Sequence, residues 1–105
     1  MKSVVETKDG ILNALHDNRD ALRALGVRRL GLFGSFVRGE QTTASDVDVL
    51  VEFEIGQKTF DHFIQLSFLL EDIFQRRVEV VTPDSLSPYL RQHILKEVVY
   101  VPVAA

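Results

Sequence analysis

Two pairs of residues in the first half of the chain have the types and spacing that metal-dependent phosphate chemistry requires. Asp46 and Asp48 are one residue apart in the run DVDVLVEF, and Gly34 and Ser35 precede them with ten residues between the pairs. Strand side chains repeat with a period of two, so the two carboxylates should share a face with α-carbons roughly 6.5 to 7 Å apart. Carboxylates so placed suit hard cations, and magnesium is the ion we expect.

Gly34 and Ser35 follow the apolar run VRRLGLF and would form the phosphate-binding half of the site. Glycine allows a ligand close to the backbone, while the serine hydroxyl and the N–H groups at a helix start can hold phosphate oxygens. A triphosphate between this turn and two cations would present its α-phosphorus to an attacking hydroxyl. The residues therefore predict nucleotidyl transfer with release of pyrophosphate.

The elements that position these residues follow from apolar periodicity and capping residues. In chain order we expect a helix over 8–25, a strand over 27–33, a very short helix ending at Gly39, a loop over 40–45, a strand over 46–53, a helix over 60–74, a strand over 77–82 and a helix from Pro88 to about Val98. The expected N-caps are Asp9, Ser35, Thr59 and Ser87. This order predicts an α/β (α+β) domain with a small mixed sheet flanked by helices.

Composition sets outer limits on the function. A chain of 105 residues predicts one domain spanning residues 1–105. It has no cysteine, which excludes disulfides and thiol catalysis, and its net charge of -3 disfavours direct nucleic-acid binding. It has no apolar run long enough to span a membrane, so we expect a cytoplasmic protein.

The segment GSFVRGEQTTASDVDVLVEF resembles the minimal nucleotidyltransferases with a DNA polymerase beta-like fold. The signature of that family is Gly-Ser, ten residues and Asp-x-Asp, and Gly34, Ser35, Asp46 and Asp48 match it. The resemblance extends to Arg38-Gly39, to Ser45 and to the downstream stretch VEVVTPDSLSPYLRQHILKEVVYV, and so covers most of the chain from Leu30 onward.

The resemblance implies a role for this chain. Family members of this size look like the antitoxin half of HEPN–MNT toxin–antitoxin pairs, in which the nucleotidyltransferase transfers AMP from ATP to a tyrosine of a helical RNase toxin. It implies a hetero-oligomer with that toxin and two Mg²⁺ ions. It assigns Asp46, Asp48 and Glu79 to catalysis and metal binding, with Glu79 where the family usually has aspartate, and Gly34, Ser35 and Arg38 to the nucleotide.

Some residues keep two interpretations. Glu79 is either a metal ligand or base, or a solvent-facing residue of an edge strand. Arg38 either contacts phosphate or pairs with a nearby acid, and Ser45 is expected to order the turn before Asp46. The phenylalanine-rich helix over 60–74 is core, with part of its surface available to a partner.

Two other functions compete with the enzymatic antitoxin. One is a catalytically weak antitoxin that neutralises its partner by binding alone. Glu79 is the sequence feature that distinguishes this hypothesis from the enzymatic one. The other is a transferase acting on a small hydroxylated molecule, which the lack of an additional acceptor-binding domain disfavours.

Overall fold

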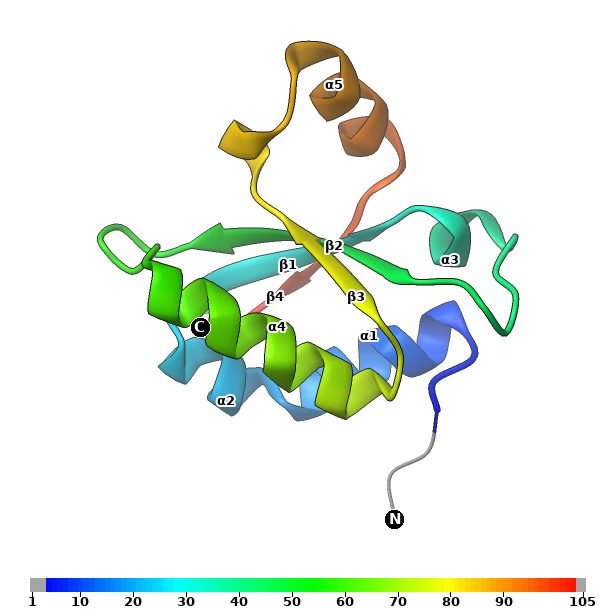
Figure 1. The fold of residues 1–105 in the computed structure, drawn as a ribbon, viewed down its shortest axis with the longest axis horizontal. Coiled ribbons are helices and arrows are strands. Elements are labelled where there is room, and N and C mark those ends of the chain that lie inside the picture. The colour runs from blue at the N-terminus through cyan, green and yellow to red at the C-terminus, as the bar shows by residue number, and fades with distance from the viewer. Residues whose placement is uncertain (1–3, 104–105) are drawn as a thin grey trace.

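The computed structural model describes residues 4–103, which form a four-stranded mixed sheet with helices on both faces (Figure 1). The helices are α1 (Lys8–Asp17), α2 (Arg19–Ala24), α3 (Ser35–Arg38), α4 (Phe60–Phe74) and α5 (Pro88–Glu97), with a 3-10 turn at Pro83–Ser85. The strands are β1 (Val27–Phe33), β2 (Val47–Phe53), β3 (Val78–Val81) and β4 (Val99–Pro102). The predicted α+β class with a small mixed sheet is confirmed.

The sheet runs in the order β3-β2-β1-β4. β1 pairs antiparallel with both β2 and β4, whereas β2 and β3 are parallel and are joined by the crossover helix α4. The sequence prediction missed β4, because the chain was expected to end its structure with a helix. β1 and β2 are therefore the central strands, and the residues at their ends are held from both sides.

The predicted helix over 8–25 is wrong in one respect, since the structure breaks it into α1 and α2. Asn18 lies at the break, and its side-chain Nδ2 donates to the Ala14 carbonyl at 2.7 Å. An asparagine that bonds to the preceding turn ends a helix readily. The N-cap is Thr7 rather than Asp9, because the Thr7 hydroxyl accepts the Gly10 N–H at 3.0 Å.

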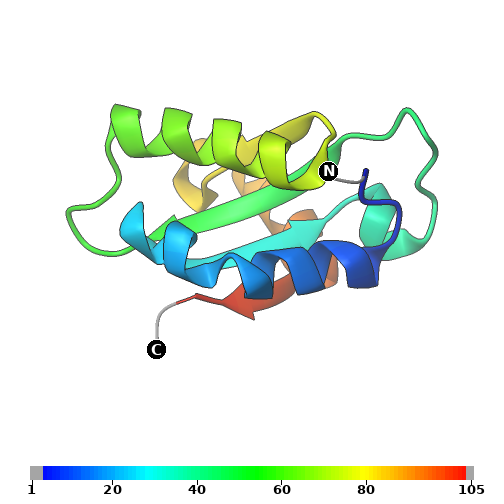
Figure 2. The same ribbon diagram turned by 90° about the horizontal axis from the view of Figure 1, so that it is seen from below.

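The core lies between the sheet and the helical layer of α1, α2 and α4, which Figure 2 shows side by side across one face. Val47, Val49 and Val51 alternate toward this layer and are fully buried. The buried set also includes Ile11, Leu15, Leu22, Val27, Leu30, Leu32, Phe36, Leu66, Leu70 and Phe74. The opposite face carries α5, and Leu50 on that face is buried as well.

Helix α4 begins as predicted, with the Thr59 hydroxyl accepting the His62 N–H at 3.1 Å. Its apolar residues are not all core, because Phe60 and Phe68 are 79% and 66% exposed. Within residues 4–103, no helix combines the length and apolar character needed to cross a bilayer.

Candidate functional site

The sheet brings the two halves of the signature together at one end. Asp48 is the second residue of β2, and it is the register partner of Phe33 on β1 and of Glu79 on β3. The Gly34-Ser35 turn follows Phe33 directly. Three segments that are separate in sequence therefore place Gly34, Asp48 and Glu79 side by side.

Gly34 has a backbone conformation and a neighbour that both require glycine. Its φ of 81° and ψ of -154° lie in a region that residues with a Cβ rarely adopt. A Cβ at this position would lie 2.1 Å from Asp48 Oδ2. The glycine thus makes room for the Asp48 carboxylate, which is a different reason from the close ligand approach expected from the sequence.

Ser35 is the first helical residue of α3, and the predicted serine cap is wrong because Gly34 occupies the N-cap position. Gly39, with a φ of 73°, ends the helix as predicted. Among residues 4–103, no hydrogen bond uses the Ser35 hydroxyl. This half-buried hydroxyl is therefore available to a ligand.

Asp48 lies in an electrostatic environment that disfavours its charge. Burial, together with the hydrogen bonding and charge of Glu79 and the charge of Asp46, raises the pKa of Asp48 to about 6, although Arg38 acts in the opposite direction. Carboxylates gathered without a compensating cation have this effect on one another. A bound divalent cation would reverse it.

Asp46 departs from the expected geometry, because β2 begins at Val47 and Asp46 lies just outside it. Its carboxylate forms an ion pair with the exposed Arg77, with Nε and Oδ1 3.6 Å apart. In the described part of the chain, no three His, Asp or Glu side chains already stand in an arrangement that could hold a metal ion. A cation here would need oxygen ligands beyond those of the protein.

The loop before Asp46 is tied down by two residues. The Ser45 hydroxyl accepts the Thr42 N–H at 2.7 Å, which confirms the turn-ordering role expected for Ser45. Arg76 donates through Nη1 to the carbonyls of Thr43 and Ser45 at 3.0 and 3.2 Å. Asp46 therefore follows a loop whose backbone carbonyls are fixed.

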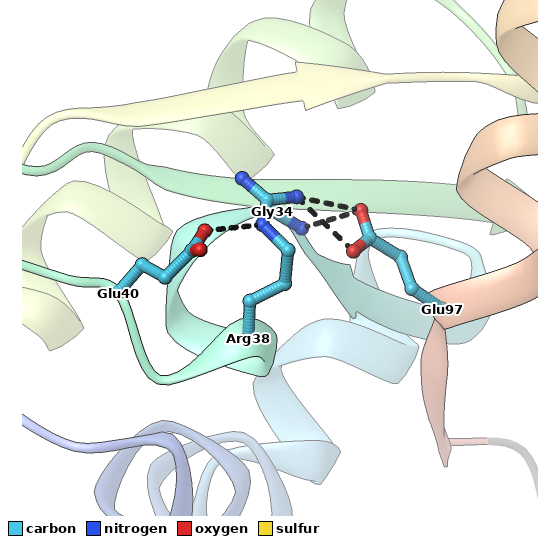
Figure 3. Close-up of polar contacts among 4 residues, drawn as sticks. All are labelled: Gly34, Arg38, Glu40 and Glu97. Carbon is cyan, nitrogen blue, oxygen red and sulfur yellow. Dashed lines mark hydrogen bonds and ion pairs between the residues drawn. The ribbon is translucent and has the colours of Figure 1, made fainter.

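Arg38 lies between two carboxylates (Figure 3). Its Nε donates to Glu40 at 2.6 Å, and its Nη1 donates to both carboxylate oxygens of Glu97 at 3.1 Å. Glu97 Oε1 also accepts the Gly34 N–H at 3.2 Å. Sequence reasoning missed Glu97, since a lone glutamate at a helix end, 63 positions from Gly34 in the chain, gives no local signal.

Two of the hollows among residues 4–103 bear on the candidate site. One of about 430 Å³ adjoins Asp46 and Arg77 and is lined by the 43–46 loop and residues 75–77. Another of about 300 Å³ is lined by residues that include Arg28, Glu52 and Lys58, and none of the predicted site residues lines it. The first hollow is the one that borders the candidate site.

A family model for the nucleotidyltransferase domain matches residues 16–101. The chain belongs to that family. The matched range contains the Gly34-Ser35 turn, Asp46, Asp48 and Glu79, so this nucleotidyltransferase carries the signature and its scaffold within the shared region.

Relatives cover most of this nucleotidyltransferase. The protein adenylyltransferase MntA of Thermococcus cleftensis is 40% identical over 97 residues, which are 92% of this chain and 95% of the relative. A Methanocaldococcus jannaschii protein assigned as a protein adenylyltransferase is 42% identical over 74 residues, 70% of this chain and 78% of the relative.

Solved structures share the fold of this nucleotidyltransferase. One assigned to the minimal nucleotidyltransferases superposes with a TM-score of 0.68 at 36% identity, covering 84% of this chain and 93% of that chain. A toxin–antitoxin structure solved with AMP-PNP superposes with a TM-score of 0.63 at 24% identity, covering 88% of this chain and 69% of that chain. The α+β sheet described above is thus that of the minimal nucleotidyltransferases.

Proposed function

We propose that this nucleotidyltransferase transfers AMP from ATP to a tyrosine hydroxyl of a partner toxin of the HEPN class and so acts as its antitoxin. The observation that carries the proposal is the meeting of Asp48 with Gly34 and Glu79 across three strands. The similarity to the protein adenylyltransferase MntA over nearly the whole of both chains supports the acceptor class.

The donor set fits magnesium. Asp46, Asp48 and Glu79 offer only carboxylate oxygens, which Mg²⁺ prefers, and the raised pKa of Asp48 reflects burial and neighbouring negative charge that a cation would compensate. Magnesium usually keeps waters and takes substrate phosphate oxygens, so a site of few protein ligands suits it. When bound, Mg²⁺ would neutralise the phosphates and stabilise the charge of the displacement.

The residues around the turn then hold the nucleotide. The unpaired Ser35 hydroxyl and the Arg38 guanidinium donate to phosphate oxygens, and Gly34 keeps the backbone clear of Asp48. The acceptor oxygen forms a bond to the α-phosphorus, and the bond from the α-phosphorus to the oxygen bridging to the β-phosphorus breaks. Pyrophosphate leaves, and the acceptor proton passes to a carboxylate, a role that we assign to the exposed Glu79.

The test uses the chain together with the protein encoded beside it. Co-expression and intact-mass analysis of that neighbour should show one or more added AMP units, which disappear with Asp48→Asn or Asp46→Asn. Glu54→Gln, in an exposed position after β2, is the matched control and should leave the modification unchanged. An unmodified neighbour in the presence of active wild-type chain, ATP and magnesium would contradict the proposal.

The competing function is an antitoxin that acts by binding alone. The ion pair between Asp46 and Arg77 favours it, since that contact occupies a carboxylate assigned to the metal. In that case neutralisation would persist in Asp46→Asn and in the absence of ATP.

A further inference from the structure

Glu97 joins the end of helix α5 to the Gly-Ser turn. Its carboxylate accepts the Gly34 N–H through Oε1, and both of its oxygens accept Arg38 Nη1 at 3.1 Å (Figure 3). The side chain is 25% exposed, so part of this contact is shielded from water. Glu97 therefore accepts hydrogen bonds from both Gly34 and Arg38.

The residues that follow Glu97 in the chain fix the position of its backbone. The Val98 N–H donates to the Ile94 carbonyl at 2.9 Å, and β4 then pairs with β1 through Leu32 and Val99. A Cβ on Gly31 would lie 2.4 Å from Val98 Cγ2, which shows how closely this segment packs on β1. Glu97 therefore reaches the turn from a fixed position and is not a mobile arm.

The two carboxylates leave one end of the Arg38 guanidinium open. Nε donates to Glu40 and Nη1 donates to Glu97, and among residues 4–103 no hydrogen bond uses Nη2. A guanidinium is planar, so two fixed nitrogens set the direction of the third. The hydrogen bonds that Arg38 donates to Glu40 and Glu97 also raise the pKa of Arg38, which keeps it charged.

We propose that Glu97 is a positioning residue for the nucleotide, acting through Arg38. The inference rests on the proposed function. Glu97 holds the guanidinium so that Nη2 remains free for a phosphate oxygen of the nucleotide. Without Glu97, the half-exposed Arg38 would lose one of its two anchors and would have to be ordered by the ligand itself, which weakens binding.

The experiment measures the ATP dissociation constant with magnesium by calorimetric titration, and kcat and KM for AMP transfer to the partner. Glu97→Ala should weaken ATP binding roughly threefold to tenfold, the range expected for a partly exposed charged hydrogen bond. Glu97→Gln, which keeps an oxygen for the Gly34 N–H, should have a smaller effect. KM for ATP should rise by a larger factor than kcat falls.

A double-mutant cycle separates positioning from a purely structural role. In an Arg38→Ala background, Glu97→Ala should have no further effect on ATP affinity. Glu54→Ala serves as the control for loss of an exposed negative charge. Thermal melts of every variant show whether the fold is kept, and Glu97→Gln carries the test if Glu97→Ala fails to fold.

The outcomes divide cleanly. A wild-type chain that binds no ATP would overturn the proposed function itself. If the wild type binds ATP, and Glu97→Ala and Glu97→Gln bind ATP as tightly as the wild type or more tightly, then Glu97 does not position Arg38 for the nucleotide. An equal loss in the presence and absence of Arg38 would also overturn the inference, because Glu97 would then act by another route.

Discussion

At the residue scale, Asp48 is the residue of the candidate site whose pKa is most clearly raised. Burial and the neighbouring Glu79 and Asp46 raise its pKa to about 6, from an ordinary value of 3.8. Gly34 gives the carboxylate its space, because a Cβ at this position would lie 2.1 Å from Asp48 Oδ2. The protein therefore holds a carboxylate whose charged form is disfavoured by its surroundings.

The pKa of Asp48 gives a stability prediction with a definite sign. The folded protein binds the Asp48 proton more tightly than the unfolded chain does. The contribution of this protonation to the free energy of unfolding is therefore fully present below about pH 4 and is lost as the pH rises through about 6. At neutral pH the charged group costs stability, and Asp48→Asn should raise the free energy of unfolding by on the order of 1 to 2 kcal/mol after allowance for solvent. Chemical denaturation at pH 7.5 with a chelator measures it.

Magnesium supplies the control for that prediction. Added Mg²⁺ should raise the melting temperature of the wild type at pH 7.5 more than at pH 5.5, because the ion must displace the Asp48 proton. Asp48→Asn should lose most of this response. An equal magnesium response in both proteins would place the ion elsewhere.

Ser35 offers a simpler separation of ligand binding from folding. Since no hydrogen bond within residues 4–103 uses its hydroxyl, Ser35→Ala should leave the melting temperature within about 1 °C of the wild type. Loss of one hydrogen bond to a charged phosphate should weaken ATP binding by about tenfold. Calorimetric titration with ATP and magnesium decides it, and unchanged affinity would leave Ser35 with no part in nucleotide binding.

The role of Glu79 can be tested by two substitutions, one of which removes the side-chain charge while the other shortens the side chain and keeps the charge. Its exposed position beside Asp48 on the adjacent strand is compatible with a base or a metal ligand. Glu79→Gln should lower the transfer rate by roughly a hundredfold, the lower range for loss of a general base, whereas Glu79→Asp should keep most of the activity. Equal rates in the two variants would identify Glu79 as a solvent-facing residue of the β3 edge.

At the element scale, the turn between β1 and α3 depends on Gly34. Gly34→Ala should destabilise the fold by about 2 kcal/mol or more, because it adds a disfavoured backbone conformation and a clash with Asp48. Gly39→Ala is the matched control, since Gly39 also has a positive φ but no atom within 4 Å of its Cβ position. Its cost should stay near 1 kcal/mol. Urea denaturation of both variants compares them directly, and equal losses would show that strain alone matters.

Several elements followed from local sequence alone. β1 has the predicted bounds, and helix α4 has both its predicted bounds and its Thr59 cap, because apolar periodicity and capping chemistry act within a few residues. The short helix ends at Gly39, where the backbone needs a positive φ. These features depend on neighbours in sequence, which is why the sequence shows them.

Other features depend on distant parts of the chain. The strand β4 forms because β1 offers a free edge, and its own four residues give a weak signal. Asp46 pairs with Arg77, because Arg77 immediately precedes β3 and its carbonyl accepts the Val47 N–H beside Asp46. Glu97 reaches Gly34 only through the packing of α5 and β4 on β1. Contacts between residues far apart in the chain produce no local sequence pattern from which they could be predicted.

At the scale of the whole molecule, the proposed site is open to solvent on the side of Glu79. The carboxylates lie at one end of the sheet, and Glu79 is exposed to solvent. Large apolar side chains are exposed on both helical layers, including Phe60 and Phe68 on α4 and Tyr89 on α5. A macromolecular acceptor could bind through its own surface to these exposed apolar side chains. This favours a macromolecule over a small hydroxylated molecule as the acceptor.

The last prediction concerns how the partner is neutralised. A tyrosine hydroxyl has an unperturbed pKa of about 10, so transfer near neutral pH needs a carboxylate or metal to help remove its proton. With ATP and magnesium, we expect AMP on a tyrosine of the toxin, located by peptide mass spectrometry, and loss of its RNase activity. Covalent modification should outlast the complex, so toxin purified away from this chain should stay inactive, and toxin incubated with Asp48→Asn should remain active after the same separation. Recovery of RNase activity on removal of the wild-type chain would show that binding alone neutralises the partner.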